Sequence, residues 1–114
     1  DYLVIGVDND KLVAENKRGS FISFEKRKMV VGSIRYVDEV RDSISWNPAV
    51  LMSQLVSEGY NLKYYFHGDD KVDPRAVEYI ESVGGEARIT PYVEGISTTY
   101  LTGLIVDRGK QNVR

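Results

Sequence analysis

The chain has 114 residues, with 42% apolar and 28% charged side chains and a formal net charge of −2, which is typical of one ordinary soluble domain. This composition points to neither a nucleic-acid nor a membrane-surface ligand, and no apolar run reaches the roughly 18 residues of a membrane span. The chain has no cysteine, which excludes disulfides and thiolate metal sites and fits a cytoplasmic protein. Its single histidine, His67, excludes a multi-histidine metal site, and we predict no metal-ligating residue.

The chain begins with a strand pattern. Residues 2–7 form a continuous apolar run, which predicts a strand buried on both faces of a parallel sheet. The polar residues 8–10 follow as a turn at the carboxyl end of that strand, and Asp10 lies in this turn. Residues 16–20 are then predicted to form a basic loop that contains a glycine.

A helix is predicted next, with Ser23 as its N-cap. Arg27 and Arg35 lie eight positions apart, which on one helix corresponds to about 80° and lets both side chains face one site. A short strand is predicted over residues 36–40, and Trp46 precedes the following helix.

The middle of the chain continues the alternation of helices and strands. Helices are predicted over residues 47–58 and 73–83, since each begins with a capping residue followed by proline and ends before glycine. Strands are predicted over residues 62–66 and 86–90. The first of these strands leads into a polar cluster, residues 67–70.

The last predicted helix opens with a glycine turn and three hydroxyl residues. Gly95 supplies the turn, Ser97 is the predicted N-cap, and the apolar periodicity runs over residues 100–106. A helix start offers unpaired N–H groups and the positive end of the helix dipole, which suits a phosphate. The hydroxyl groups of Ser97, Thr98 and Thr99 can donate to the same anion, while a plain helix cap is the alternative interpretation.

Strands that alternate with helices predict an α/β fold with a Rossmann-like parallel sheet, flanking helices and right-handed crossovers. We find no linker or internal repeat, so residues 1–114 are predicted to form one domain. In such sheets ligands bind at the carboxyl ends of the strands. Three of these ends carry polar residues, namely Asp10, residues 67–70 and residues 92–99. The sequence therefore predicts a small-molecule site there, and ordinary solvated turns remain the alternative for each loop alone.

Three stretches then carry a family resemblance: Arg27-Lys28 with residues 34–40, His67-Gly68-Asp69-Asp70, and Glu94-Gly95-Ile96-Ser97-Thr98-Thr99. In this order they resemble the cytidylyltransferase family over nearly the whole chain. The branch that acts on glycerol 3-phosphate is the most similar, and Trp46 falls where that branch has a tryptophan. The ethanolamine-phosphate and choline-phosphate branches are the next most similar.

The resemblance implies a nucleotidyltransferase that transfers CMP from CTP to a small alcohol phosphate and releases pyrophosphate. It also implies Mg²⁺ as the cofactor that accompanies the nucleoside triphosphate. By the same resemblance, the catalytic lysine loop matches Lys17 or Arg18. The nucleotide-binding residues would be His67, Asp70, Gly95, Ser97, Thr98 and Thr99. The residues that bind the phosphate-ester substrate would be Asp10, Arg27, Arg35 and Trp46.

Two departures from the family pattern stand out. The family begins with a strand and a His-x-Gly-His loop, whereas Asp1 corresponds to the start of the family's second strand. The missing strand would lie in the centre of the sheet, and without it two sheet halves would each expose an unpaired inner edge. We therefore expect residues 1–114 to be a domain that lacks its first strand and helix, completed by an upstream segment or by another chain.

The second departure is Tyr92-Val93, where cytidylyltransferases have Arg-Thr. It leaves open an alternative function, an adenylyltransferase that acts on a sugar phosphate, because that family also has a Gly-x-Ser-Thr-Thr stretch. A non-catalytic nucleotide-binding relative is the third possibility. A homodimer is expected from the family, with residues 38–40 near its interface.

Overall fold

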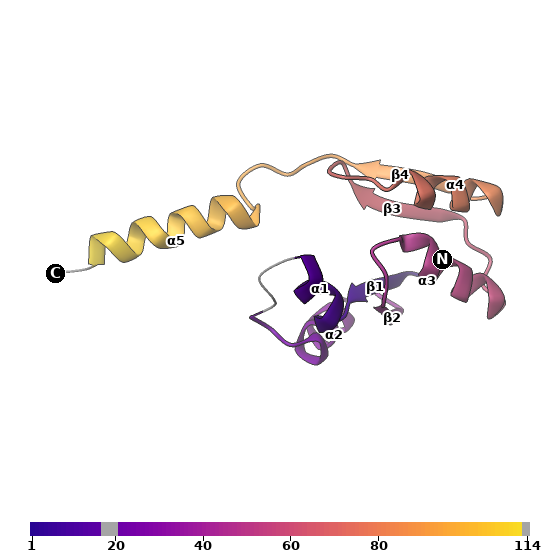
Figure 1. Cartoon of the computed structure of the whole chain (residues 1–114), viewed down its shortest axis with the longest axis horizontal. Helices are drawn as coiled ribbons and strands as arrows, with labels where there is room; N and C mark the ends of the chain where they lie inside the picture. Colours follow the sequence, from indigo (N-terminus) through magenta and orange to yellow (C-terminus); the bar gives the residue numbers. More distant parts are fainter. Residues whose placement is uncertain (17–20, 113–114) are drawn as a thin grey trace.

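The structure is a computed structural model that describes residues 1–16 and 21–112. Its elements follow the chain in the order β1 (Val4–Asp8), α1 (Asp10–Asn16), α2 (Phe24–Gly32), β2 (Glu39–Ser43), α3 (Pro48–Ser57), β3 (Tyr64–Gly68), α4 (Pro74–Ser82), β4 (Glu86–Thr90) and α5 (Thr98–Asn112). Figure 1 shows the elements in this order, with α5 at one end of the molecule. No described helix is long and apolar enough to cross a membrane.

The described strands form two separate parallel sheets. β1 pairs with β2 in the register Val4 to Glu39, and β3 pairs with β4 in the register Tyr64 to Glu86. Parallel strands joined through helices confirm the predicted α/β fold, which is consistent with a Rossmann-like nucleotidyltransferase. The described strands do not form one continuous sheet, and the completion of the sheet by a further strand stays a prediction.

Three of the predicted strands begin two or three residues later in the structure. β1 starts at Val4, β2 at Glu39 and β3 at Tyr64, because the ladder pairing sets the strand bounds rather than the apolar run alone. His67 therefore lies inside β3 and not after it. The prediction that the first strand is buried on both faces is wrong: within β1 only Val7 is buried, while Val4, Ile5 and Asp8 are partly buried and Gly6 is exposed.

The helices agree better with the sequence, with two exceptions. Ser23, Asn47 and Asp73 are the N-caps of α2, α3 and α4, as predicted. The structure adds α1, where the sequence predicts a turn followed by a loop. In α1 the side chain of Asn9 accepts a hydrogen bond from the amide of Leu12 at 2.8 Å, so Asn9 caps the helix.

The second exception concerns α2. This helix ends at Gly32, and its C-cap Ser33 donates its backbone N–H to carbonyls of the last turn. Arg35 therefore lies in the following turn and not on the helix. The prediction that Arg27 and Arg35 share one helix face is wrong, because the backbone changes direction between them.

The helices lie on different faces of the two sheets. α2 packs on the face of β1–β2 that carries Val40, whose Cγ2 is 3.5 Å from the position of a Cβ at Gly32. α3 packs on the opposite face, where a Cβ on Gly6 would be 2.8 Å from Leu51 Cδ2. Glycine at this position therefore allows the close approach of helix and strand. α3 also contacts α4, so these two helices form one layer.

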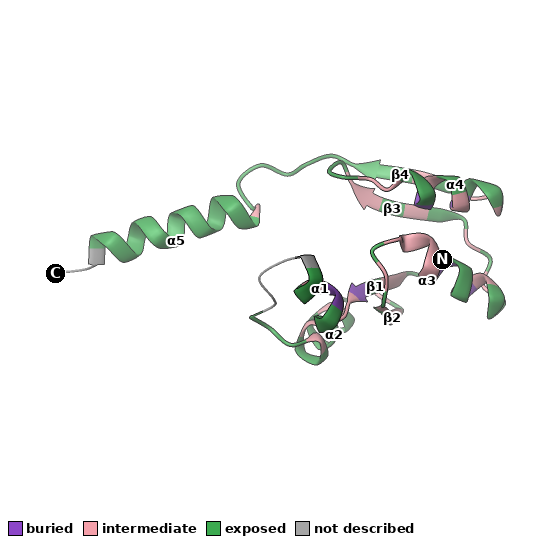
Figure 2. Cartoon of the chain, viewed as in Figure 1, coloured by how far each residue is buried: buried purple, intermediate pink, exposed green. Residues whose placement is uncertain are grey.

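The hydrophobic core lies between this layer and the sheets. Within the described residues the buried apolar side chains are Val7, Leu12, Met52, Leu55, Ala76 and Ile80. Met52 of α3 packs with Ala76 and Ile80 of α4, and Tyr65 and Ala87 of β3 and β4 pack against them. Figure 2 shows that burial is confined to this region and to β1–α1, while α5 is exposed throughout its described length.

Candidate functional site

The candidate site lies at the carboxyl ends of the strands, where the loops after β1, β2, β3 and β4 emerge. In the described part of the chain, no hydrogen bond or ion pair joins a candidate residue of one half to a candidate residue of the other.

Arg27 ties α2 to the carboxyl end of β1. Its guanidinium group donates to the Asp8 carbonyl at 2.8 Å, to the Asp10 carboxylate at 2.7 Å and to the Ile22 carbonyl at 3.0 Å. The Asp10 carboxylate also accepts the Phe24 amide at 3.0 Å. The Phe24 amide, followed by Arg27, lowers the pKa of Asp10 below its usual range. Arg27 and Asp10 thus hold each other at the strand end, and this cation is already engaged by protein groups.

The neighbouring surface of this half is polar and hollowed. A hollow of ≈ 260 Å³ is lined by Asn9, Lys11, Leu12, Glu15 and Ile44, between α1 and the end of β2. Trp46 lies two positions after Ile44 along the chain, is 37% exposed and immediately precedes the N-cap Asn47 of α3. Trp46 is not among the residues that line the hollow, but its partly exposed ring in the same connection offers a flat surface for a small ligand.

The β3–β4 half contributes the polar cluster that follows β3. The Asp69 carboxylate accepts the Tyr92 amide at 3.0 Å, which fixes the loop after β3 to the segment after β4. The His67 Nδ1 lies 2.8 Å from the Gly68 carbonyl, and the His67 carbonyl accepts the Thr90 hydroxyl at 3.2 Å. The side chain of Asp70 is exposed beside them. His67 is partly buried, on the same face of β3 as Tyr65 and not in solvent.

The start of α5 has the geometry of a capped helix. Gly95 has a φ of +85°, a left-handed conformation that favours glycine, so the sharp turn needs this residue. The Ser97 hydroxyl accepts the Tyr100 amide at 3.1 Å, which confirms Ser97 as the N-cap. Within the described residues the amides of Thr98 and Thr99 have no partner, and both side chains are exposed. These donors are available to an anion.

One of the remaining predicted residues, Arg35, is not brought to this edge. Arg35 lies between α2 and β2, at the amino end of the strands, with its guanidinium 5.0 Å from the ring of Tyr36. The predicted catalytic residues Lys17 and Arg18 lie outside the described residues. A larger hollow of ≈ 500 Å³ lies at the amino ends of β3 and β4, which is the edge of the sheet opposite the candidate site. It is open to solvent and lined largely by the loop residues 61–63 and 84–85.

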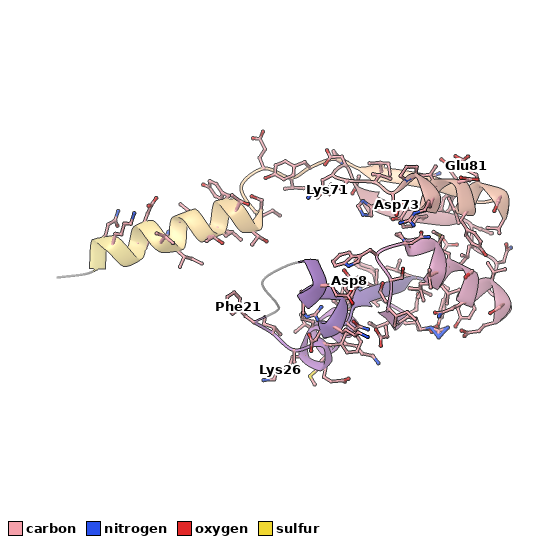
Figure 3. All side chains as sticks on the ribbon, in the orientation of Figure 1. Asp8, Phe21, Lys26, Lys71, Asp73 and Glu81 are labelled. Carbon is pink, nitrogen blue, oxygen red and sulfur yellow. The ribbon has the colours of Figure 1, made fainter. Side chains whose placement is uncertain are left out.

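The structure adds a cation, Lys71, that the sequence alone does not single out. Lys71 follows Asp70 and has a φ of +47°, a strained conformation for a residue with a side chain. Figure 3 shows Lys71 near the carboxyl end of β3, facing away from the core. Its only signal in the sequence is its place directly after the His-Gly-Asp-Asp stretch.

Comparison of the sequence with known proteins finds named relatives. The chain is 30% identical to the glycerol-3-phosphate cytidylyltransferase of Bacillus subtilis, over 87% of this chain and 71% of that protein. It is 31% identical to the mouse ethanolamine-phosphate cytidylyltransferase, over 90% of this chain but 25% of that protein. It is 28% identical to the Dictyostelium discoideum ethanolamine-phosphate cytidylyltransferase, over 97% of this chain and 32% of that protein. No family model matches the chain.

Proposed function

The chain belongs to the cytidylyltransferase family, and from this premise we propose that it binds CTP and serves the transfer of CMP to a small alcohol phosphate. Glycerol 3-phosphate or an amino-alcohol phosphate is the proposed acceptor class, since the relatives named above act on glycerol 3-phosphate and ethanolamine phosphate. The chain spans about a quarter of the mouse relative's length, and the activity of a whole protein is part of the proposal.

In the proposed reaction, an oxygen of the acceptor phosphate attacks the α-phosphorus of CTP. A new P–O bond forms while the bond from the α-phosphorus to the β-phosphate oxygen breaks, and pyrophosphate leaves with the electron pair. The protein must neutralise the charge that grows on the phosphates and hold both reactants in line.

The observation that carries the proposal is the start of α5. The free amides of Thr98 and Thr99 and the exposed hydroxyls beside Ser97 lie next to a glycine turn at the positive end of a helix. We assign the β- and γ-phosphates of the nucleotide to these groups. The polar cluster His67 to Asp70 lies at the neighbouring strand end and is proposed to contact the nucleoside.

The acceptor phosphate is assigned to the β1–β2 half. Trp46 and the hollow beside α1 supply the surface, and Lys11 lines that hollow as a cation. Arg27 acts as a positioning residue in this half, because its guanidinium group is engaged by Asp8, Asp10 and Ile22. Lys17 and Arg18 stay the proposed catalytic cations on the strength of the family resemblance.

Mg²⁺ is proposed to arrive with the nucleotide. Among the described residues no group of three or more histidine, aspartate or glutamate side chains is arranged to hold a metal ion. Such a surface fits a cation that is bound mainly through phosphate oxygens and water, which is the usual state of Mg²⁺ with a nucleotide. When bound, the ion would neutralise phosphate charge.

Thermal unfolding in the presence of nucleotides tests the proposal. With Mg²⁺ present, CTP is expected to raise the midpoint, and cytidine without phosphate is expected to leave it unchanged. A larger shift with ATP would favour the adenylyltransferase function that Tyr92-Val93 leaves open. Binding of CTP without release of pyrophosphate from any acceptor phosphate would favour a nucleotide-binding relative. No shift with either nucleotide would contradict the proposal.

A further inference from the structure

One face of the β3–β4 sheet is not covered by any described helix. α4 packs on the face of Tyr65 and Ala87, which leaves the alternate residues on the other side: Tyr64, Phe66, Glu86, Arg88 and Thr90. We call these residues the bare face. Tyr64 and Phe66 are 49% and 54% exposed, and the Arg88 guanidinium lies 4.3 Å from the centre of the Tyr64 ring. The two aromatic rings lie 5.9 Å apart.

The bare face is exceptional for this architecture. Parallel sheets in α/β proteins have helices on both faces, because both faces are apolar. β1–β2 follows this rule, with α2 on one side and α3 on the other. In β3–β4 the α3–α4 layer covers one side, and the place that corresponds to α2 on the other side is not filled by a described element.

α5 is a helix that lacks a packing partner among the described elements. Leu101, Leu104 and Ile105 are 43%, 37% and 70% exposed, and their spacing places them on one side of the helix. Thr102 and Lys110 lie on other sides of it. Figures 1 and 3 show α5 extending past the carboxyl ends of β3 and β4, away from the other elements. The radius of gyration is accordingly 16.8 Å, against roughly 13 Å for a compact domain of this length.

We propose that α5 folds back over the bare face of its own chain, with Leu101, Leu104 and Ile105 against Tyr64 and Phe66. The connection over residues 91–97 permits this, since at full extension it spans roughly 20 Å. The hydrogen bond from the Tyr92 amide to Asp69 holds the beginning of the connection at the strand ends. The reversal therefore takes place between this anchor and the N-cap of α5, in the stretch that contains Gly95.

The same chain, and not a second copy, is the occupant because the connection is short. A helix tethered by a few residues has an effective concentration in the millimolar range at the neighbouring face, above the concentration of a second protein in ordinary samples. Folding back also runs α5 antiparallel to β4. The end of the helix then lies over the amino end of the strand, which is the opposite of its present direction.

A disulfide between engineered cysteines tests this arrangement directly, because the natural chain has no cysteine. Glu86→Cys with Arg108→Cys joins the amino end of β4 to the apolar side of α5. The matched control is Glu86→Cys with Lys110→Cys, which moves the helical thiol by about 200° to the opposite side. Neither pair alters the proposed nucleotide site, and the experiment is done without nucleotide, so its outcome is independent of the proposed function.

We expect the double variant Glu86→Cys with Arg108→Cys to form an intramolecular disulfide roughly tenfold faster than the control variant, as measured by intact mass and gel mobility of the monomer. Equal rates for the two variants, or disulfide-linked dimers alone, would overturn the proposal. As a further variant, Leu104→Asp added to the first pair of substitutions is expected to reduce its rate to that of the control. Thr102→Asp, with the same charge on another side of α5, is expected to leave the rate unchanged. An unchanged rate in the Leu104→Asp variant would also overturn the proposal.

Discussion

The two halves of the molecule differ in how completely helices cover the faces of their parallel sheets. The β1–β2 sheet has helices on both faces and is tied at both ends by side chains. Arg27 and Asp10 tie the carboxyl end, and Tyr2, Tyr60 and Glu39 tie the amino end. The β3–β4 sheet has the best-buried core residues of the described chain but is covered on one face only.

The two halves also differ in how many polar groups they leave free for a ligand. The amino end of β1–β2 is a closed polar network, in which both tyrosine hydroxyls donate to Glu39 and Arg41 pairs with Glu39 at 2.9 Å and with Glu58. Such a network holds elements together and leaves few groups for a ligand. The carboxyl end of β3–β4 and the start of α5 have free amides and exposed hydroxyls instead. This contrast supports the proposal that a nucleotide binds mainly in the β3–β4 half and at the start of α5.

The largest effect is expected from the core of the β3–β4 half. Ile80 is fully buried between α4 and the sheet, so Ile80→Ala should lower the free energy of unfolding by about 2–5 kcal/mol, through lost burial and the cavity left behind. The matched control is Ile34→Ala in the turn after α2, where the side chain is 51% exposed. Urea unfolding of both variants measures the difference. Equal losses would mean that this half has no core of its own.

A smaller effect is expected at the carboxyl end of the β1–β2 half. Arg27→Ala removes the hydrogen bonds to the Asp8 carbonyl, the Ile22 carbonyl and the Asp10 carboxylate, which should cost about 1–2 kcal/mol in a partly exposed position. Lys26→Ala, in the same turn of α2 but exposed, is the control. Urea unfolding again provides the measurement. A loss no greater than that of the control would show that Arg27 is free to bind a ligand.

The tyrosine network at the amino end predicts a loss of stability at alkaline pH. The hydrogen bond to Glu39 raises the pKa of Tyr60 from 10.0 to about 12. Because the folded-state pKa is the higher one, this contribution is complete below about pH 10 and is lost as the pH rises toward 12. Tyr60→Phe should reduce the alkaline loss, whereas Tyr100→Phe on α5 should retain it. Unfolding midpoints across this range measure it, and an identical alkaline loss in the Tyr60→Phe variant would contradict the prediction.

The smallest effect on global stability is expected at the start of α5. Ser97→Ala removes the side-chain acceptor for the Tyr100 amide, which should weaken the first turn of the helix by about 1 kcal/mol. Hydrogen exchange of the α5 amides is the measurement, since these amides report local opening. Thr102→Ala in the second turn is the control. Equal exchange in both variants would mean that the cap does not hold the helix start.

The bounds of β4 and the N-caps of the helices agree between the sequence prediction and the structure. β4 was predicted over residues 86–90 and is observed as Glu86–Thr90, because a glycine pair before it and a proline after it leave little freedom. The caps Ser23, Asn47 and Ser97 were predicted because short polar side chains bond to amides nearby in the chain. Each of these features depends on contacts within a few residues.

The features that depend on distant contacts were predicted less well. Arg41 and Asp42 extend β2 beyond its apolar residues, because pairing with β1 and the ion pairs of Arg41 outweigh the low strand preference of charged residues. Arg35 does not share a helix face with Arg27, because α2 ends at Gly32, before Arg35 is reached. The exposed position of α5 has no signal in the sequence, since Leu101, Leu104 and Ile105 have the pattern of a packed helix.

For the candidate site, the sequence identified the strand ends but not the partners of each side chain. It singled out Asp10 and Arg27 as substrate-binding residues, and the structure shows that they bind each other. It missed Lys71, because a lysine in a polar loop has no distinctive neighbours in sequence and its position depends on the left-handed backbone there.

The most direct test of the account follows the backbone amides by NMR while CTP and Mg²⁺ are added. If the start of α5 binds the triphosphate, the amides of Thr98 and Thr99 should shift most, together with residues 67–70 after β3. Pyrophosphate should shift the α5 amides alone, and cytidine should leave them unchanged. Shifts confined to the β1–β2 half, or no shifts at Thr98 and Thr99, would contradict the central claim.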